Sequence, residues 1–224
     1  SKNLSGLIIS RTLRNDKRFK ILTDLKIPFV AHGRSKSCDD SAWLDIDNEA
    51  AFYDMTNHFI SLGHKKIAHI GGPSIYNFSI QREVGWRKAL SEEGLSVSSK
   101  YFQVAELSFE GGMKAMNELL KLKNPPTSVC CVSDTVAVGA MQSLRNHNIY
   151  PGKEISLIGY DGLALGAWME PQLSTMEHSL QSVGRELAEM LIKLVEGRKK
   201  PTELQKLFSA SILRRSTDNP PMAE

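Results

Sequence analysis

The chain has 224 residues, of which 41% are hydrophobic and 24% charged, and its formal net charge is +3. This balance is typical of a globular protein of one or two domains and excludes a disordered or collagen-like chain. No apolar run reaches the roughly eighteen residues that cross a bilayer, and the first residues lack the pattern of a signal peptide, so we expect a cytoplasmic protein without membrane contact.

Short apolar runs rich in β-branched residues alternate along the chain with longer segments of helical period. In chain order, we expect a strand at residues 6–10, a helix at 16–25, a strand at 27–32, a loop to residue 47, a helix at 47–63, a strand at 66–71, a helix at 80–93, a strand at 101–105, a helix at 110–122, a strand at 128–132, a helix at 135–145, a strand at 155–160, a helix at 182–196 and a strand at 207–213. This alternation predicts an α/β fold with a parallel sheet.

Polar side chains follow four of the predicted strands, at the points where those strands end. They are Arg34 after the second strand, Asn77 and Arg82 after the third, Ser133 and Asp134 after the fifth, and Asp161 after the sixth. Ligands of open α/β sheets bind beyond the carboxyl ends of the strands, so we expect these groups at one edge. Because Arg, Asp and Asn can each bond two neighbouring hydroxyl groups, they predict a polyhydroxylated ligand. Tyr76, Phe78 and Trp168, in expected loops near that edge, can cover the apolar face of a sugar ring.

Three of these polar residues also have an ordinary structural interpretation. Asp134 directly precedes a predicted helix and can be its N-cap. Asp161 precedes Gly162 and can belong to a turn. Arg82 can be a solvated helix residue. The convergence of four strands on one edge, more than any single residue, favours a ligand site.

Signatures of catalysis are absent from the sequence. There is no G-x-S-x-G, H-E-x-x-H, G-x-G-x-x-G or G-x-x-x-x-G-K-[ST] motif. The three cysteines, Cys38, Cys130 and Cys131, have neither a disulfide framework nor zinc-site spacing. His64 lies between a glycine that we expect to close a helix and the next strand, where a hydrogen-bonded structural role is favoured over a catalytic one. The predicted class is therefore binding without chemistry, with no cofactor and no metal.

Several segments resemble, in order, the motifs of the lactose-repressor (LacI/GalR) family of bacterial transcription regulators. Residues 62–72 (LGHKKIAHIGG) and 82–86 (REVGW) resemble the family signature, 133–139 (SDTVAVG) its N-D-x-x-A-x-G, 155–162 (ISLIGYDG) its I-S-V-V-G-[FY]-D-[DN], 171–175 (PQLST) its P-x-L-T-T, and Gly184 with 215–217 (RST) its late glycine and closing R-x-S-T. The resemblance covers nearly the whole chain.

The resemblance implies a periplasmic-binding-protein-like type I fold, in which two doubly wound parallel-sheet subdomains are joined by three crossovers and bind a sugar or similar effector between them. It implies an N-terminal subdomain of residues 1–63 and 179–205, a C-terminal subdomain of residues 64–178 and 206–217, and a tail of residues 218–224. His64 would then lie at the first crossover. It places effector contacts at Arg82, Ser133 and Asp161, cleft-lining residues at Phe78, Leu107 and Leu180, and a dimer contact at Val138.

Two departures from the family pattern affect which effector is bound. Gly33 and Arg34 stand where the family often has Asp, and Ser133 replaces a more usual Asn. Family members also begin with a helix-turn-helix DNA-binding domain, a hinge helix and the first elements of the effector domain, and this chain starts after all of them. The resemblance therefore implies part of a regulator that should not bind operator DNA by itself.

On this interpretation the whole regulator is a homodimer that binds a mono- or disaccharide and reaches operator DNA only through the missing domain. The effector would favour one arrangement of the two subdomains and so alter the dimer geometry. Two alternatives stay open. A periplasmic sugar-binding protein would share the fold but need a signal peptide, and a sugar-processing enzyme would have to turn over a substrate without a recognisable motif.

Overall fold

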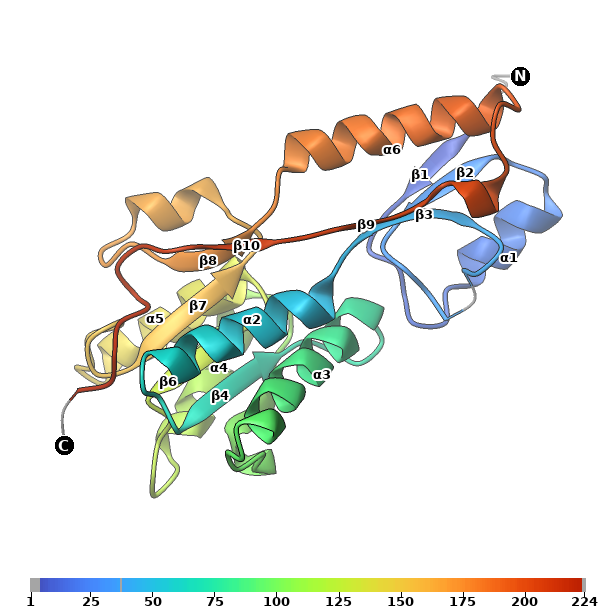
Figure 1. Cartoon of the computed structure of the whole chain (residues 1–224). Coiled ribbons are helices and arrows are strands. Elements are labelled where there is room, and N and C mark those ends of the chain that lie inside the picture. Colours follow the sequence, from blue (N-terminus) through green and yellow to red (C-terminus); the bar gives the residue numbers. More distant parts are fainter. Residues whose placement is uncertain (1–4, 37, 223–224) are drawn as a thin grey trace. The chain divides into compact units, whose positions relative to one another are not determined.

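The computed structural model describes residues 5–36 and 38–222, whose contacts divide them into two compact units (Figure 1). Unit 1 comprises the described residues up to Asp47, Ser74–Phe78 and Ser179–Ser209, and unit 2 comprises Asn48–Pro73, Ser79–His178 and the described residues from Ala210 onward. Each unit contains a largely parallel sheet with helices, which confirms the predicted fold class. Within the described ranges, every helix is too short or too polar to span a bilayer.

Unit 1 is built on a four-stranded sheet in which all neighbouring strands are parallel. Its strands are, in spatial order, β1 (Leu7–Ile9), β2 (Phe29–His32), β3 (Ala42–Ile46) and β9 (Gln205–Phe208). Helix α1 (Lys17–Asp24) begins at the N-cap Asp16, whose side chain accepts a hydrogen bond from the N–H of Arg18. It buries Phe19 and Leu22 in a cluster with residues of β1 and β2. Helix α6 (Leu180–Val195) packs on the same two strands.

Unit 2 is built on a six-stranded sheet, parallel except for its last strand. In spatial order the strands are β10 (Ser211–Leu213), β8 (Ser174–Glu177), β7 (Ser156–Tyr160), β6 (Ser128–Cys131), β4 (Ile67–Gly71) and β5 (Phe102–Val104), with β10 antiparallel to β8. The helices are α2 (Asn48–Ser61), α3 (Asn77–Glu92), which belongs to this unit from Ser79 onward, α4 (Phe109–Leu120) and α5 (Asp134–Asn146). Figure 1 shows α2 and α3 on one face of this sheet and α4 and α5 on the other.

The division between the units differs from the expected one at residues 48–63, 74–78 and 206–209. Residues 48–63 were expected in the first subdomain, but the ring of Phe52 in α2 stacks on Tyr160 of unit 2, with 5.9 Å between centroids. Residues 206–208 belong to β9, which pairs with β3 in unit 1. The chain therefore leaves unit 1 after Asp47, and His64 lies inside unit 2, not at the first crossover.

Strand β3 lies in the segment predicted as a loop. Its sequence AWLDI contains Asp45, a charged residue that interrupts the apolar pattern. Asp45 is nevertheless buried, because its carboxylate accepts hydrogen bonds from the Nε of Arg34 (2.9 Å) and from the N–H of Ile46 (2.8 Å). Tertiary pairing thus offsets a local sequence that disfavours a strand.

The C-terminal strands also differ from prediction. Strand β8 (STME) was missed, because its buried Ser174 and Thr175 are polar and have hydrogen-bond partners that lie far away in the sequence, among them Asp218 and Asp134. The single strand predicted at 207–213 is in fact two strands. Strand β9 ends at Phe208 in the sheet of unit 1, and β10 begins at Ser211 in the sheet of unit 2.

Helices α4 and α5 meet backbone to backbone through two glycines. A Cβ atom placed on Gly139 would lie 2.0 Å from the carbonyl oxygen of Phe109, and one on Gly112 would lie 2.1 Å from the carbonyl oxygen of Val136. Both distances are far below the 3.0 Å that real Cβ contacts respect. The close approach therefore requires glycine at both positions. Gly184 in α6 is the opposite case, since nothing lies within 4 Å of a Cβ placed there.

His69, in the middle of β4, is fully buried in the core of unit 2. Its ring contacts three aromatic rings, with centroids 5.0 Å away at Phe52, 5.5 Å at Phe102 and 5.8 Å at Trp86. Its Nδ1 donates to the carbonyl oxygen of Cys130 at 2.9 Å. Burial lowers the pKa of His69 to about 4, and the positive charges of Arg82 and Arg87 act in the same direction. The imidazole is therefore neutral in the folded protein at neutral pH.

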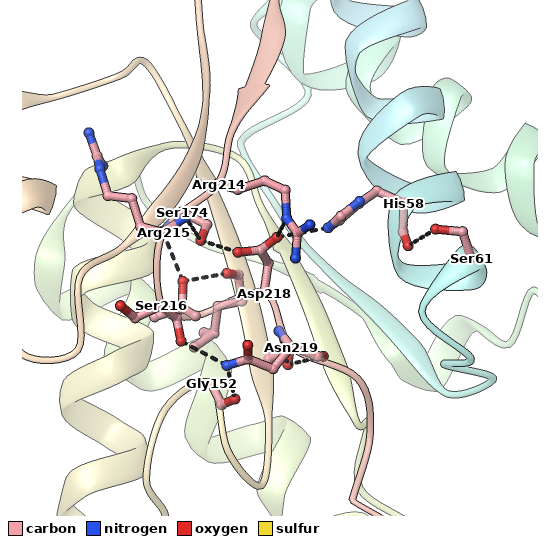
Figure 2. Close-up of polar contacts among 12 residues, drawn as sticks. His58, Ser61, Gly152, Ser174, Arg214, Arg215, Ser216, Asp218 and Asn219 are labelled. Carbon is pink, nitrogen blue, oxygen red and sulfur yellow. Dashed lines mark hydrogen bonds and ion pairs between the residues drawn. The ribbon is translucent and has the colours of Figure 1, made fainter.

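The segment around Asp218 ties the C-terminal part of the chain to unit 2 (Figure 2). Asp218 is 1% exposed, and its carboxylate accepts hydrogen bonds from Ser174 Oγ (2.5 Å), Arg214 Nε (2.7 Å) and His58 Nε2 (2.8 Å). Burial acts to raise the pKa of Asp218, but these hydrogen bonds outweigh it and hold the pKa below its usual value. The side chain of Asn219 donates to two backbone carbonyl oxygens. The predicted tail therefore starts with two anchored residues.

We expect Asp218→Ala to lower the free energy of unfolding by about 2–4 kcal/mol, because it leaves Ser174 and His58 without their buried acceptor. The control is Asp24→Ala, which removes an exposed carboxylate paired with Lys20 and should cost less than about 0.5 kcal/mol. Urea unfolding of both variants at pH 7 makes the comparison. Equal small losses would show that the Asp218 anchor does not stabilise the fold.

Candidate functional site

Arg82 is held at the carboxyl ends of two neighbouring strands of unit 2. It lies in α3 and is only 7% exposed. Its Nη1 donates to the carbonyl oxygen of Val132, directly after β6, and its Nε donates to Oδ1 of Asn48 at 2.8 Å. The guanidinium carbon lies 3.6 Å from the ring centroid of Tyr160, the last residue of β7. The interpretation of Arg82 as a solvated helix residue is therefore wrong.

Asp161 follows Tyr160 directly and is half-buried beyond the end of β7. Its φ of +120° is rare for a residue with a side chain, and Gly162 follows at +68°, so the backbone forms the turn that the sequence allowed. Burial raises the pKa of Asp161 to about 6, while the charge of Arg82 lowers it and that of Asp134 raises it. At pH 7 the carboxylate is thus mainly ionised.

Ser133 and Asp134 follow β6 at the same edge and have structural partners of their own. Ser133 is the N-cap of α5, and its Oγ accepts from the N–H of Val136 at 3.3 Å. Asp134 accepts from the N–H of Leu163 (2.7 Å) and from the hydroxyl of Thr175 (2.7 Å), which ties α5 to the loop after β7 and to β8. The N-cap interpretation of Asp134 is therefore wrong, and the cap is its neighbour.

Leu107 and Trp168 complete the predicted residues of unit 2. Leu107 comes after β5 and lies beside Gly72, the residue that follows β4. A Cβ atom placed on Gly72 would lie 3.0 Å from Cδ2 of Leu107. Trp168 ends a short 3₁₀ helix, Ala164–Trp168, that follows Asp161. Its indole is 87% exposed, which leaves the ring face accessible to a ligand.

The other predicted residues belong to unit 1: Arg34, Asn77, Phe78 and Leu180. Arg34 follows β2 and is paired with Asp45. Asn77 and Phe78 are the first residues of α3, which begins three residues before the predicted start, so Phe78 is not in a loop. The Phe78 ring stacks on Tyr76, with 5.3 Å between centroids. Leu180 is the first residue of α6 and is exposed.

His64 has the structural role that its position predicts. It is 2% exposed, with Nδ1 2.9 Å from the hydroxyl oxygen of Thr127 and Nε2 2.9 Å from the carbonyl oxygen of Asn219. Burial lowers its pKa. Because a carbonyl oxygen can only accept, Nε2 carries the proton, and the neutral ring joins two segments of unit 2.

Asn48 is the residue that sequence reasoning missed. It is 2% exposed, it opens α2, and it accepts the hydrogen bond from Nε of Arg82. A polar residue at a helix start is ordinarily a cap, so the sequence gives no sign of this contact.

The edge of unit 2 therefore presents the buried guanidinium of Arg82 and the half-buried carboxylate of Asp161 at neighbouring strand ends. A guanidinium only donates hydrogen bonds and an ionised carboxylate only accepts them, so together they suit a ligand whose groups do both. Among the described residues, no cluster of three or more His, Cys, Asp or Glu side chains is arranged to hold a metal ion.

Comparison with known proteins connects this geometry to a family. The model of the periplasmic binding protein-like domain matches residues 56–217. A regulatory protein of the LacI family from Chloroflexus aggregans is 31% identical, with a TM-score of 0.89 over 96% of this chain and 77% of that one. The chain belongs to the LacI/GalR family. The HTH-type transcriptional regulator AglR of Rhizobium meliloti (strain 1021) is 34% identical over 98% of this chain and 63% of AglR.

A LacI-family regulator from Enterococcus faecium, solved with bound ribose, has the same fold, with a TM-score of 0.86 at 23% identity over 97% of this chain and 81% of that one. The family resemblance and the periplasmic-binding-protein-like fold predicted for this LacI/GalR chain are thus confirmed. The chain spans less than two thirds of the length of AglR. These two relatives are named as regulators.

Proposed function

We propose that this LacI-family chain is the effector-binding part of a transcriptional regulator, and that Arg82 and Asp161 bind a mono- or disaccharide. The proposal depends chiefly on the buried guanidinium and the half-buried carboxylate at neighbouring strand ends of unit 2. The ribose bound to the Enterococcus faecium relative supports the sugar class.

The opposite charges of Arg82 and Asp161 favour a neutral polyhydroxylated ligand. An anion would meet the carboxylate, and a cation would meet the guanidinium, so each would be repelled by one of the two groups. A sugar hydroxyl can accept from Arg82 and donate to Asp161. The exposed indole of Trp168 suits the apolar face of a sugar ring. Ser133, Leu107 and the predicted residues of unit 1 stay sequence-based predictions for the same ligand.

The proposal extends to the whole regulator. We propose that it is a cytoplasmic homodimer that uses Val138 of α5 as a dimer contact and reaches operator DNA through a separate helix-turn-helix domain. The HTH-type name of AglR supports that last part. Effector binding would act by shifting the population between two arrangements of the regulator.

A thermal-shift screen tests the sugar site. The probes are mono- and disaccharides, sugar phosphates and nucleosides, applied to the wild type, Arg82→Lys and Asp161→Asn. A ligand at a hundredfold its dissociation constant adds about 2.7 kcal/mol, which raises the midpoint by several degrees. We expect one saccharide to do so for the wild type and for neither variant.

Asp161→Asn separates binding from folding. Asparagine keeps the shape and tolerates a positive φ. The folded pKa of Asp161, about 6, lies above the ordinary aspartate value of 3.8, so the ionised form costs stability at pH 7. The variant should therefore be more stable than the wild type at pH 7, by about 1–3 kcal/mol, while it loses the sugar response. A full response in Asp161→Asn, equal to that of the exposed control Asp24→Asn, would contradict the assignment.

A further inference from the structure

Asn48 occupies the point where the chain enters unit 2. Asp47 is the last residue of the first segment of unit 1, and its N–H donates to the carbonyl oxygen of Phe208 at 2.8 Å, next to the end of β3. Asn48 follows as the first residue of α2 and of unit 2. One peptide bond therefore separates a residue fixed in the sheet of unit 1 from a side chain buried in unit 2.

Side-chain hydrogen bonds to the next helix hold Asn48 in place. Its Oδ1 accepts from Nε of Arg82 at 2.8 Å, and its Nδ2 donates to Oε1 of Gln81 at 3.3 Å. Both partners lie on the next helix, α3, so the side chain links the start of α2 to that helix. The stronger of the two links is the one to Arg82, because its donor is charged and its distance shorter.

The guanidinium of Arg82 is fixed from three sides. Asn48 holds its Nε edge, the carbonyl oxygen of Val132 accepts from Nη1, and the ring of Tyr160 lies against its face. A guanidinium is planar, so these contacts set the direction in which its fork points. Val132 contributes a backbone atom and Tyr160 a ring face, whereas Asn48 supplies a side-chain hydrogen bond that a substitution can remove.

We propose that Asn48 is a positioning residue, which orients the Arg82 guanidinium for the effector and couples the occupancy of Arg82 to the crossover between Asp47 and Asn48. The second part rests on the proposed function of Arg82. Residues at the ends of elements commonly absorb the backbone rotation of hinged proteins. A ligand that pulls on Arg82 therefore acts, through one hydrogen bond, on the first residue after the crossover.

The orientation of Arg82 can be measured without a ligand. The NMR signal of its Nε–H group, assigned by its loss in Arg82→Lys, reports whether that proton is bonded. We expect Asn48→Leu to speed its exchange with water by at least about tenfold, since a buried bond to a charged donor is lost. Asn48→Asp, which keeps the acceptor oxygen, should retain the protected signal. Gln81→Leu is the control that removes another partner of Asn48 and leaves the Arg82 signal in place.

Coupling to the crossover is tested by hydrogen exchange of the backbone amides at residues 45–50. Arg82→Lys should speed this exchange in the wild type and add nothing in the Asn48→Leu background, as expected for two residues that act through one contact. Asn48→Ser, too short to reach Nε, replaces Asn48→Leu if that variant does not fold. Equal effects of Arg82→Lys in both backgrounds, or an unchanged Nε–H signal without Asn48, would overturn the proposal.

These measurements fail independently of the sugar assignment. If no saccharide binds but the exchange of residues 45–50 is coupled to Arg82, only the proposed function is contradicted. If a saccharide from the screen binds to Asn48→Ser as tightly as to the wild type, only the positioning role is contradicted. We expect Asn48→Ser to weaken that binding by at least about tenfold and Asn48→Asp to restore it.

Discussion

Gly139→Ala should lower the free energy of unfolding by about 3 kcal/mol, a large effect for the addition of one methyl group. The new carbon would lie 2.0 Å from the carbonyl oxygen of Phe109 and 2.9 Å from the backbone nitrogen of Met113. Both are backbone atoms of α4 that no side-chain rotation can move away. The two helices must separate, which opens the interface they share with β4 and β7. Gly112→Ala meets Val136 in the same way and should act in the same direction.

The same substitution at Gly184 provides a matched control with the opposite sign. Gly184 is an exposed position in α6, where the new methyl group meets nothing. Replacing glycine by alanine within a helix should stabilise the protein there by about 0.5–1 kcal/mol. Urea unfolding of both variants at pH 7 gives the comparison. A stabilising effect at Gly139 would mean that α4 and α5 lie farther apart than the structure shows.

The second large effect is a loss of stability in acid through His69. The folded-state pKa is about 4 and the ordinary pKa of a histidine is 6.5, so between these pH values the unfolded chain binds more protons than the folded protein. Stability therefore falls as the pH falls from 6.5 to 4, and His69 alone accounts for about 3 kcal/mol over that window. Asp161 acts in the opposite direction between pH 6 and 3.8, because burial raises its pKa.

A difference measurement isolates His69 from the other titrating groups. His69→Phe keeps a ring beside Phe52, Trp86 and Phe102 but cannot be protonated. The free energy of unfolding is measured at pH 7 and at pH 4 for both proteins. The decrease from pH 7 to pH 4 should be about 3 kcal/mol smaller for His69→Phe than for the wild type. Parallel pH curves for the wild type and His69→Phe would contradict the lowered pKa.

Some residues of the candidate site can be predicted from their position after a strand. Others are identified only by their tertiary contacts. Arg82 and Asp161 could be selected from sequence, because residues that follow parallel strands gather at one edge whatever the rest of the fold does. Asn48 could not be selected, since its partner lies on another helix and its own position is that of an ordinary helix start. Asp134 was misassigned for the same reason, because its acceptor atoms serve Leu163 and Thr175.

Prediction of the strands from sequence has the same limit, because it depends on the local pattern of residues. Apolar strands such as β4, β6 and β7 were predicted because each is buried on both faces and reads as an apolar run. Strand β3 and strand β8 contain buried polar residues whose partners are distant in sequence, so their local pattern resembles a loop. The break between β9 and β10 also has no local signal, since nothing in residues 207–213 says that the strand changes sheets.

That change of sheets sets the order in which the chain can fold as it is synthesised. The first three strands of unit 1 leave the ribosome early, but α6 and β9, which cover and extend that sheet, are among the last elements made. Until then β3 has an unpaired edge. In unit 2, by contrast, β4 to β8 form one continuous stretch, so all but the final strand of that sheet can pair before α6 emerges. Most of the sheet of unit 2 can therefore pair before the sheet of unit 1, although the strands of unit 1 are begun first.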